Sequence, residues 1–266
     1  MKLKPVKLDR KIPLGDKDAR APKGAPTGDA LDEEMDKQVE RISDLQKVFY
    51  ADGRYALLIV LQGRDASGKD GTIRKVFRAV NPLGCAVSSF KAPTDEELRH
   101  DYLWRTHRKV PERGMIGIFN RSHYEDVLAV RVHALVPKKV WSARYEQIND
   151  FERMLTENRV VILKFMLHVS RDEQKRRFNE RLEDETKNWK FREGDLKDRD
   201  VWGEFTKAYR AALTKCSTDW APWYVVPSDD EEVRNLLVAR TIADTLDAMN
   251  LRYPKLDPAL KDLTIE

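Results

Sequence analysis

The pattern of apolar positions along the chain predicts strands that alternate with helices. Residues 55–61 (YALLIVL) and 160–167 (VVILKFML) are nearly continuous apolar runs, as expected for strands buried on both faces of a parallel sheet. Shorter apolar runs at 86–90, 115–119 and 224–226 predict three further strands. Because helical stretches separate these runs, the sequence predicts an α/β fold built from right-handed βαβ units.

Apolar residues spaced three and four apart predict the helices. The clearest stripe begins at Leu31 and predicts a long amphipathic helix that ends before Gly53. Two capping boxes, which begin at Thr94 and Ser170 and each place a Glu three residues later, predict two more helix N-termini. The expected helices span about 32–50, 73–80, 94–107, 138–157, 170–182 and 231–249.

The elements indicate one domain with an irregular arm and a helical insertion. Residues 1–29 contain four prolines and few apolar positions, so we expect an arm that is a partly ordered surface tail. Residues 30–266 contain no linker and no internal repeat, which favours a single domain. A charged helical insertion at about 171–215 is expected to form a lid, with its tryptophans packing it rather than binding a base.

Composition narrows the class of protein. The 266 residues include six Trp, eight Tyr and nine Phe, which excludes disorder for most of the chain. No apolar run is long enough to cross a bilayer, and no apolar segment follows the basic N-terminus as a signal peptide would require. Two cysteines favour a reducing cytoplasm. The 49 basic and 45 acidic residues do not by themselves indicate binding to nucleic acid.

A glycine-rich loop directly follows the first predicted strand. The sequence GRDASGK at 63–69 has the GxxxxGK pattern, with a buried strand before it and a helix after it. Small residues let the backbone curl so that successive N–H groups, together with a helix N-terminus and a lysine, surround a phosphate. The predicted phosphate-binding loop and first helical turn comprise Gly63, Arg64, Asp65, Ala66, Ser67, Gly68, Lys69, Asp70, Gly71 and Thr72.

One position in this loop departs from the usual pattern. Asp70 stands where a Ser or Thr hydroxyl normally binds magnesium. The metal must therefore be held mainly by carboxylates, and Asp65 within the loop is one candidate.

Charged residues also follow the third predicted strand. The segment NRSHYED spans 120–126, and ligands of open parallel sheets bind at the carboxyl ends of the strands. Arg121 could clamp a phosphate with two hydrogen bonds, and Glu125 or Asp126 could hold magnesium. A solvated charged turn is the alternative interpretation.

The insertion carries further cations. Arg177 and Arg181 lie four residues apart and share one face of a predicted helix. They could project into the active cleft and stabilise a phosphoryl group during transfer. An exposed helix covered by ion pairs explains the same residues.

These motifs together resemble the family-2 polyphosphate kinases, over about Asp32 to Pro254. The marks of the resemblance are QGRDASGKDGTI at 62–73, NPLG at 81–84, DYLWR at 101–105, FNRSHYEDV at 119–127 and WKF at 189–191. The resemblance implies a P-loop kinase fold, with a five-stranded parallel sheet flanked by helices and a helical lid. It also implies phosphoryl transfer between inorganic polyphosphate and a nucleotide, with Mg²⁺, or Mn²⁺ in its place.

The resemblance assigns roles to the residues that match these motifs. Asp65 and Asp126 would bind the metal, and Lys69 and Arg121 would bind the transferred phosphate. From the lid, Arg177 and Arg181 would bind polyphosphate or the leaving group. From the metal assignment we expect Asp126→Asn to nearly abolish turnover without unfolding the chain.

The segment 120–125 also bears on the acceptor. Its NRSHYE form resembles the class III members, which accept AMP as well as ADP, whereas Arg64 departs from the usual class III pattern. The acceptor would be an adenine or guanine nucleotide, contacted by Asn120, Glu125 and Arg131. A polyphosphate chain needs a basic channel, which Arg74, Lys75 and Arg78 could line together with the lid arginines.

Two other functions fit parts of the sequence. An ATP-dependent nucleoside monophosphate kinase similar to thymidylate kinase shares the loop and the Arg segment, but Asp70 argues against it. A P-loop module that binds nucleic acid without turnover is the second alternative. The apolar stripe of the long N-terminal helix has two explanations that fit equally well. The helix could pack on its own domain, or it could form the interface of a homo-oligomer.

Overall fold

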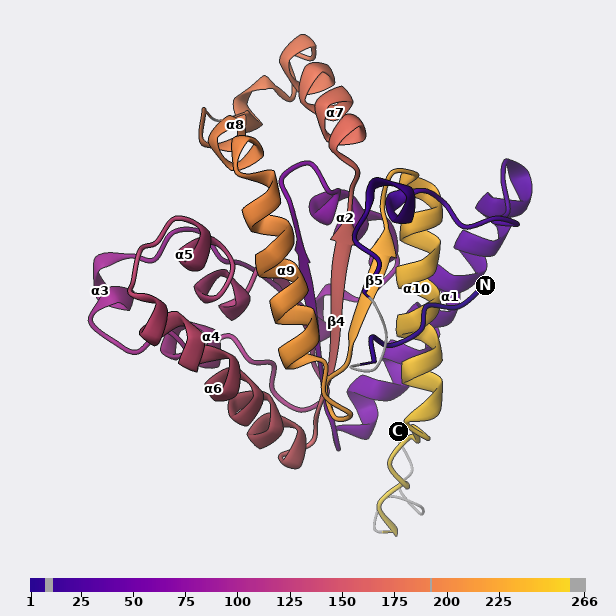
Figure 1. Ribbon diagram of the computed structural model, residues 1–266. Coiled ribbons are helices and arrows are strands. Elements are labelled where there is room, and N and C mark those ends of the chain that lie inside the picture. The colour runs from indigo at the N-terminus through magenta and orange to yellow at the C-terminus, as the bar shows by residue number, and fades with distance from the viewer. Residues whose placement is uncertain (8–11, 192, 259–266) are drawn as a thin grey trace.

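The structure, a computed structural model, describes residues 1–7, 12–191 and 193–258. Its centre is a five-stranded sheet in the order β2-β3-β1-β4-β5, in which all neighbouring strands are parallel (Figure 1). The strands are β1 (Ala56–Gly63), β2 (Cys85–Ser89), β3 (Ile116–Asn120), β4 (Val160–His168) and β5 (Trp223–Pro227). All five predicted strands are therefore confirmed, and their ends differ from the expected ones by at most two residues.

Alternate residues of β1 face two separate helical layers, because successive side chains of a strand point to opposite faces. Leu57, Ile59 and Leu61 pack against α1 (Asp29–Asp52), α2 (Lys69–Val76) and α10 (Glu231–Ala248). Leu58 and Val60 pack against α6 (Lys138–Glu157) and α9 (Trp202–Cys216). Helices thus cover both faces of the sheet, as the continuous apolar pattern of β1 requires (Figure 1).

The helix expected over 94–107 is divided in two. The capping box at Thr94 is present, and it opens only the short helix α3 (Asp95–Leu98). Asp101 then accepts hydrogen bonds from the N–H groups of Leu103 and Trp104 at 2.9 and 3.1 Å, and this local turn precedes α4 (Trp104–His107). A third short helix, α5 (Ala129–Val132), follows the segment after β3.

The second capping box is only half formed. Ser170 Oγ accepts from the Glu173 N–H at 3.2 Å and caps α7 (Arg171–Glu183). The reciprocal bond is replaced, because the Ser170 N–H donates to Asp229 at 2.8 Å and the Glu173 carboxylate pairs with Arg176 and Arg177. The helix start was predicted correctly, but a tertiary contact to Asp229 and ion pairs within α7 replace the second bond of the capping box.

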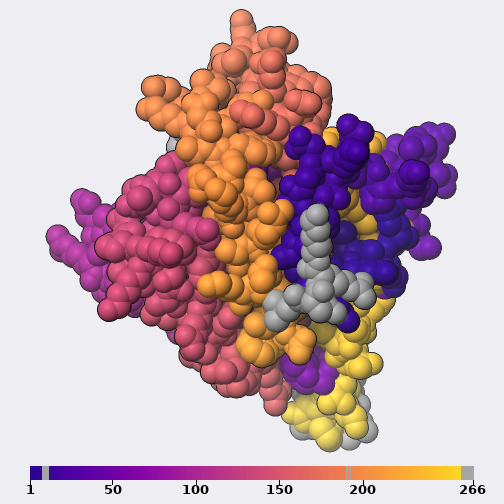
Figure 2. All heavy atoms as spheres, viewed as in Figure 1, coloured from indigo at the N-terminus to yellow at the C-terminus, as the bar shows by residue number. Residues whose placement is uncertain are grey.

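The described part of the N-terminal arm packs on the domain. Ile12 and Leu14 are buried in the core, and the N–H of Val6 donates to the carbonyl of Trp223 at 2.8 Å. A 3₁₀ turn, η1 (Asp16–Ala19), follows. Figure 2 shows this indigo segment on the surface, between the orange and yellow parts of the chain, so part of the expected arm is held against the domain.

The predicted insertion comprises two different parts. Helix α7 and helix α8 (Glu193–Asp200), with the turn η4 (Asn188–Lys190) between them, extend beyond the carboxyl edge of the sheet (Figure 1). Helix α9 instead belongs to the core, where Phe205, Ala208 and Leu213 are buried. We call α7, η4 and α8 the helical extension. Within the residues described, no helix is long and apolar enough to span a membrane.

Candidate active site

The glycine-rich loop joins β1 to α2 and requires glycine at two places. Gly68 has a φ of 93°, and a Cβ there would lie 2.1 Å from a guanidinium nitrogen of Arg234. A Cβ on Gly63 would lie 2.6 Å from the carbonyl oxygen of Leu167. Because α2 begins at Lys69, the N–H groups of its first turn lie at the loop, where they can bind an anion.

The Lys69 ammonium lies across this loop. Its Nζ donates to the carbonyls of Gly63 and Arg64 at 2.8 and 3.0 Å. Burial, together with the positive charge of Arg121, lowers the pKa of Lys69 to about 8. A bound phosphate would stabilise the charged form, so the loop is organised to receive an anion beside this lysine.

Arg121 connects the phosphate loop with the segment after β3. One nitrogen of its guanidinium donates to Asp65 Oδ1 at 2.6 Å, and the other lies 3.7 Å from Glu125 Oε2. These carboxylates raise the pKa of Arg121, the charge of Glu125 most. The residue holds a positive φ of 61° while its N–H donates to Leu61 of β1. Strand pairing therefore brings Asp65 to Arg121, which lies 56 residues further along the chain, and to Glu125, which follows four residues after Arg121.

The side chains of Asp65, Arg121 and Glu125 line one cleft between the loop and α9. Asp198 of the helical extension adds a third carboxylate, whose pKa is raised by burial and by the neighbouring charge of Asp65. Asp198 was not predicted from the sequence, because it is one of many charged residues in that region. The residues that line the cleft are Gly63, Arg64, Asp65, Arg121, Glu125, Ala129, Gln174, Asp198, Trp202, Phe205 and Tyr209.

Arg64 joins the loop to the N-terminus of α9. Its guanidinium stacks 3.7 Å from the centre of the Trp202 ring and donates to the Trp202 carbonyl and to Thr206 Oγ1. Burial lowers the pKa of Arg64 to about 10. Trp202 therefore packs as expected, whereas Trp189 of the extension is 72% exposed, contrary to the expectation that the tryptophans pack the insertion.

Asp70, the residue that replaces the usual hydroxyl, is bonded to the neighbouring strand. Asn120 Nδ2 donates to Asp70 Oδ1 at 2.7 Å. This hydrogen bond connects the first turn of α2 to the end of β3. It also uses the side chain of Asn120, which was expected to contact the acceptor nucleotide. Arg131, expected there too, donates instead to the hydroxyl of Tyr145 at 3.0 Å. Of the three predicted acceptor residues, only Glu125 lines the cleft.

Asp126 has a partner of its own. Its Oδ1 accepts from Arg144 at 2.9 Å, and burial raises the pKa of the carboxyl while the Arg144 charge opposes that shift. Asp65 lines the cleft and Asp126 does not, so the two expected metal ligands have different surroundings. Over the described ranges, no group of three or more His, Cys, Asp or Glu side chains is arranged to hold a metal.

The carboxylates of Asp65 and Glu125 nevertheless suit a magnesium ion. Both line the cleft next to the phosphate loop, and carboxylate oxygens are ligands that this ion prefers. Magnesium commonly takes one or two protein carboxylates and completes its shell with phosphate oxygens and water. A pair of carboxylates is therefore a sufficient protein contribution.

The two lid arginines do not line the cleft. Arg177 is 6% exposed and donates to the carbonyls of Ala66, Ser228 and Asp229 at 2.7 to 3.0 Å. It therefore clamps the phosphate loop to the loop after β5. Arg181 lies over the ring of Phe178 at 5.7 Å, on α7. The prediction that both side chains project into the cleft is not reproduced by these contacts.

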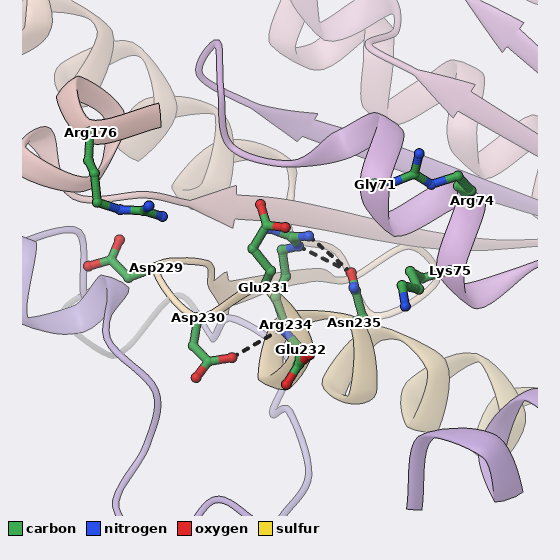
Figure 3. A pocket seen from close by; sticks show the side chains of 10 residues that line it. All are labelled: Gly71, Arg74, Lys75, Arg176, Asp229, Asp230, Glu231, Glu232, Arg234 and Asn235. Carbon is green, nitrogen blue, oxygen red and sulfur yellow. Dashed lines mark hydrogen bonds and ion pairs between the residues drawn. The ribbon is translucent and has the colours of Figure 1, made fainter. Parts of the chain in front are cut away.

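A second opening, which we call the groove, lies beside α2 and has a volume of about 400 Å³ (Figure 3). Arg74 and Lys75, two of the residues expected in the channel, line it together with Arg176, whereas Arg78 pairs with Asp36 on α1. Its other lining residues are Gly71, Asp229, Asp230, Glu231, Glu232, Arg234 and Asn235. The groove thus contains as many acidic as basic side chains.

Arg234 lies behind the phosphate loop and was not predicted from the sequence. The side chain is fully buried, its Nε donates to Thr72 Oγ1 at 2.9 Å, and burial lowers its pKa to about 10. The sequence held one signal of this buried arginine, its position on the apolar face of α10 between Val233 and Leu237. A charged residue on such a face is rarely buried without a specific partner.

The sheet order, the loop at the end of β1 and the arginine after β3 define a P-loop kinase fold. A family model described as polyphosphate kinase 2 matches residues 27–254. The chain belongs to the polyphosphate kinase 2 family, as the sequence motifs indicated.

Similar proteins agree with this assignment. An AMP/ADP-polyphosphate phosphotransferase of Meiothermus ruber is 51% identical over 226 residues, which is 85% of each chain. An ADP-polyphosphate phosphotransferase of Rhodopseudomonas palustris is 47% identical over 234 residues, covering 84% of this chain and 81% of that one. The crystal structure of polyphosphate kinase 2 from Arthrobacter aurescens is 41% identical, covers 88% of this chain and 86% of that chain, and has a TM-score of 0.84.

Proposed function

We propose that this chain transfers the terminal phosphoryl group of inorganic polyphosphate to AMP and ADP, and catalyses the reverse reaction. The observation that carries the proposal is the contact of Arg121 with Asp65 and Glu125 beside the phosphate loop. The names of the relatives support the substrates, and they do not favour a monophosphate kinase that uses ATP or a nucleic-acid-binding module.

The chemistry needs positioning and charge neutralisation more than proton transfer. Lys69 and the N–H groups at the start of α2 would bind the phosphoryl group, and Arg121 would neutralise its charge. An oxygen of the nucleotide phosphate attacks the terminal phosphorus, the bridging P–O bond breaks, and polyphosphate leaves one unit shorter. The attacking oxygen is already ionised, since the second phosphate pKa is about 6.

Asp65 and Glu125 would hold Mg²⁺, or Mn²⁺ in its place, and we retain Asp126 as a further metal ligand. The ion would neutralise charge on the phosphate oxygens during transfer. Each of these carboxylates lies on the loop or on the turn η3 (His123–Asp126) after β3, so strand ends position all three.

The groove is our candidate for the path of the polymer. Arg74, Lys75 and Arg176 would contact its phosphates, with Arg78 on the nearby surface of α2 and α1. Because four acidic residues share the groove, we expect divalent cations to accompany the polymer there. The proposal includes a cytoplasmic location, supported by the two cysteines of the sequence, and a contribution to ATP regeneration.

The test uses purified protein, magnesium and long-chain polyphosphate without ATP. AMP is added to one sample and ADP to another, and the nucleotides are separated by chromatography. We expect ADP and then ATP from AMP, and ATP from ADP. Product from ADP alone would restrict the acceptor to diphosphates. The proposal would be overturned if neither sample gave product while a separate sample with ATP phosphorylated a nucleoside monophosphate.

A further inference from the structure

Gln62 is a buried polar residue directly before the phosphate loop. It is fully buried near the end of β1, where its side chain meets the segment that follows β3. Its amide lies within hydrogen-bond distance of Ser122 and Glu125. Gln62 thus lies beside Glu125, which lines the cleft.

Only one orientation of the amide satisfies both of its polar atoms. With the oxygen toward Ser122, it accepts from the Ser122 N–H at 3.0 Å and from Oγ at 3.1 Å, and the nitrogen then donates to Glu125 Oε1 at 3.1 Å. The Ser122 hydroxyl can donate in this arrangement, since its oxygen accepts from the N–H of Tyr124. The reverse orientation would point the amide oxygen at a carboxylate in a buried site, which is costly.

The two oxygens of Glu125 therefore have different partners. Oε1 accepts from Gln62 at 3.1 Å, whereas Oε2 lies 3.7 Å from Arg121. Arg121 meanwhile makes its short contact, 2.6 Å, with Asp65. Without the Gln62 donor, the Glu125 carboxylate would gain from rotating toward Arg121, and this would draw the guanidinium away from Asp65.

We propose that Gln62 is a positioning residue that fixes the Glu125 carboxylate for the acceptor nucleotide. The inference rests on the proposed function, in which Glu125 holds the metal, and on the sequence-based expectation that Glu125 contacts the acceptor nucleotide. Gln62 itself is buried and does not line the cleft, so it acts through Glu125.

The first test is Gln62→Met, which keeps the length of the side chain and removes the hydrogen bonds. We expect the KM for AMP and ADP to rise about tenfold, the cost of one hydrogen bond to a charged group, with the KM for polyphosphate unchanged. Gln38→Met is the matched control. Gln38 is another buried glutamine, on α1, bonded to Glu34 and Arg41, and its loss should leave both KM values unchanged.

The second test exchanges the amide and the carboxylate. Gln62→Glu places two carboxylates together, so its activity should fall at least tenfold at pH 8. Glu125→Gln alone should also lose activity. The double variant restores a carboxylate–amide pair, and we expect it to exceed both single variants at pH 8. A structural role alone would not produce this rescue.

The outcomes separate the positioning role of Gln62 from the function on which it rests. Wild-type protein that makes no nucleotide product from polyphosphate overturns both. Active wild-type protein with unchanged kinetics in Gln62→Met overturns the positioning role alone. That role is also overturned if Gln62→Met raises both KM values equally, or if the double variant does not exceed both single variants at pH 8.

Discussion

Two regions of this molecule carry the charges that a phosphoryl transferase needs, and they are built differently. At the carboxyl edge of the sheet, residues 62–69 and 120–126 come from adjacent strands, and Asp65, Arg121 and Glu125 meet there. In the helical extension, Arg177 and Arg181 are regularly spaced, but their side chains do not come together at the cleft. Arg177 donates to backbone carbonyls instead.

The difference lies in what sets the direction of a side chain. The parallel register, with Leu61 opposite Asn120, places the residues after both strands at one edge whatever packs around them. The face that a helix presents depends on how the helix docks. Strand ends therefore predict a site from sequence more reliably than a helical spacing does.

The largest effect is expected at the carboxyl edge. Arg121→Met removes the guanidinium that contacts Asp65 and faces Glu125, so we expect turnover to fall roughly 1000-fold with the fold intact. Steady-state kinetics with polyphosphate and ADP measures the loss, and circular dichroism checks the fold. A loss below tenfold would contradict the assignment of this edge as the reaction centre.

Asp126→Asn sharpens the comparison within the same edge. From the proposed role of Asp126 as a metal ligand, we expect turnover to fall roughly 100-fold or more while the protein stays folded. A titration with magnesium should show a higher requirement than in wild type. A near-normal rate at saturating magnesium would contradict the metal role and leave the pairing with Arg144 as the function of this carboxylate.

Arg177→Met tests the structural role of the extension's arginine. The variant leaves three carbonyls without their donor and removes one of the two arginines that pair with Glu173, so the free energy of unfolding should fall by about 3 kcal/mol. Urea denaturation measures this change. Arg181→Met, on the same helix, is the control and should change stability much less. Equal stability of the Arg177 variant and wild type would restore the view of Arg177 as a free lid residue.

The pH dependence of stability tests the burial of Lys69. Its pKa is about 8 in the folded protein and about 10.5 when unfolded, so the unfolded chain binds more protons between these values. Burying the charged lysine lowers the free energy of unfolding below pH 8, and this loss is recovered as the pH rises from 8 toward 10.5. Relative to Lys69→Met, wild type should gain stability from pH 8 to pH 10 in denaturant titrations. Parallel curves for the two proteins would contradict the lowered pKa.

The smallest effect is expected at Arg78. Its exposed pair with Asp36 should contribute less than about 1 kcal/mol, so Arg78→Ala should leave stability almost unchanged. Lys75→Ala, in the groove, should raise the KM for polyphosphate more than Arg78→Ala does, with a weaker dependence on salt. The reverse order would move the polymer path from the groove to the surface of α1 and α2.

Much of the fold follows from local patterns. The run Tyr55–Leu61, the GxxxxGK loop and the helix after it form a unit whose signals lie within about 25 residues. The strand and the loop were placed correctly, whereas the helix, expected over 73–80, begins and ends about four residues earlier, at Lys69–Val76. The division of the helix after Thr94 was missed, because the turn at Asp101 competes with helix continuation through side-chain bonds that the apolar pattern does not reveal.

By itself, the sequence determined the strands, the phosphate loop and the family, because apolar periodicity and loop chemistry act over short distances. Only the tertiary structure decided the partners of each charge. Arg177 reaches Ala66 across 111 residues of chain, Arg234 reaches Thr72 across 162, and Gln62 meets Glu125 through the register of β1 and β3. A guanidinium or an amide can satisfy many acceptors, and the packing of distant elements selects among them.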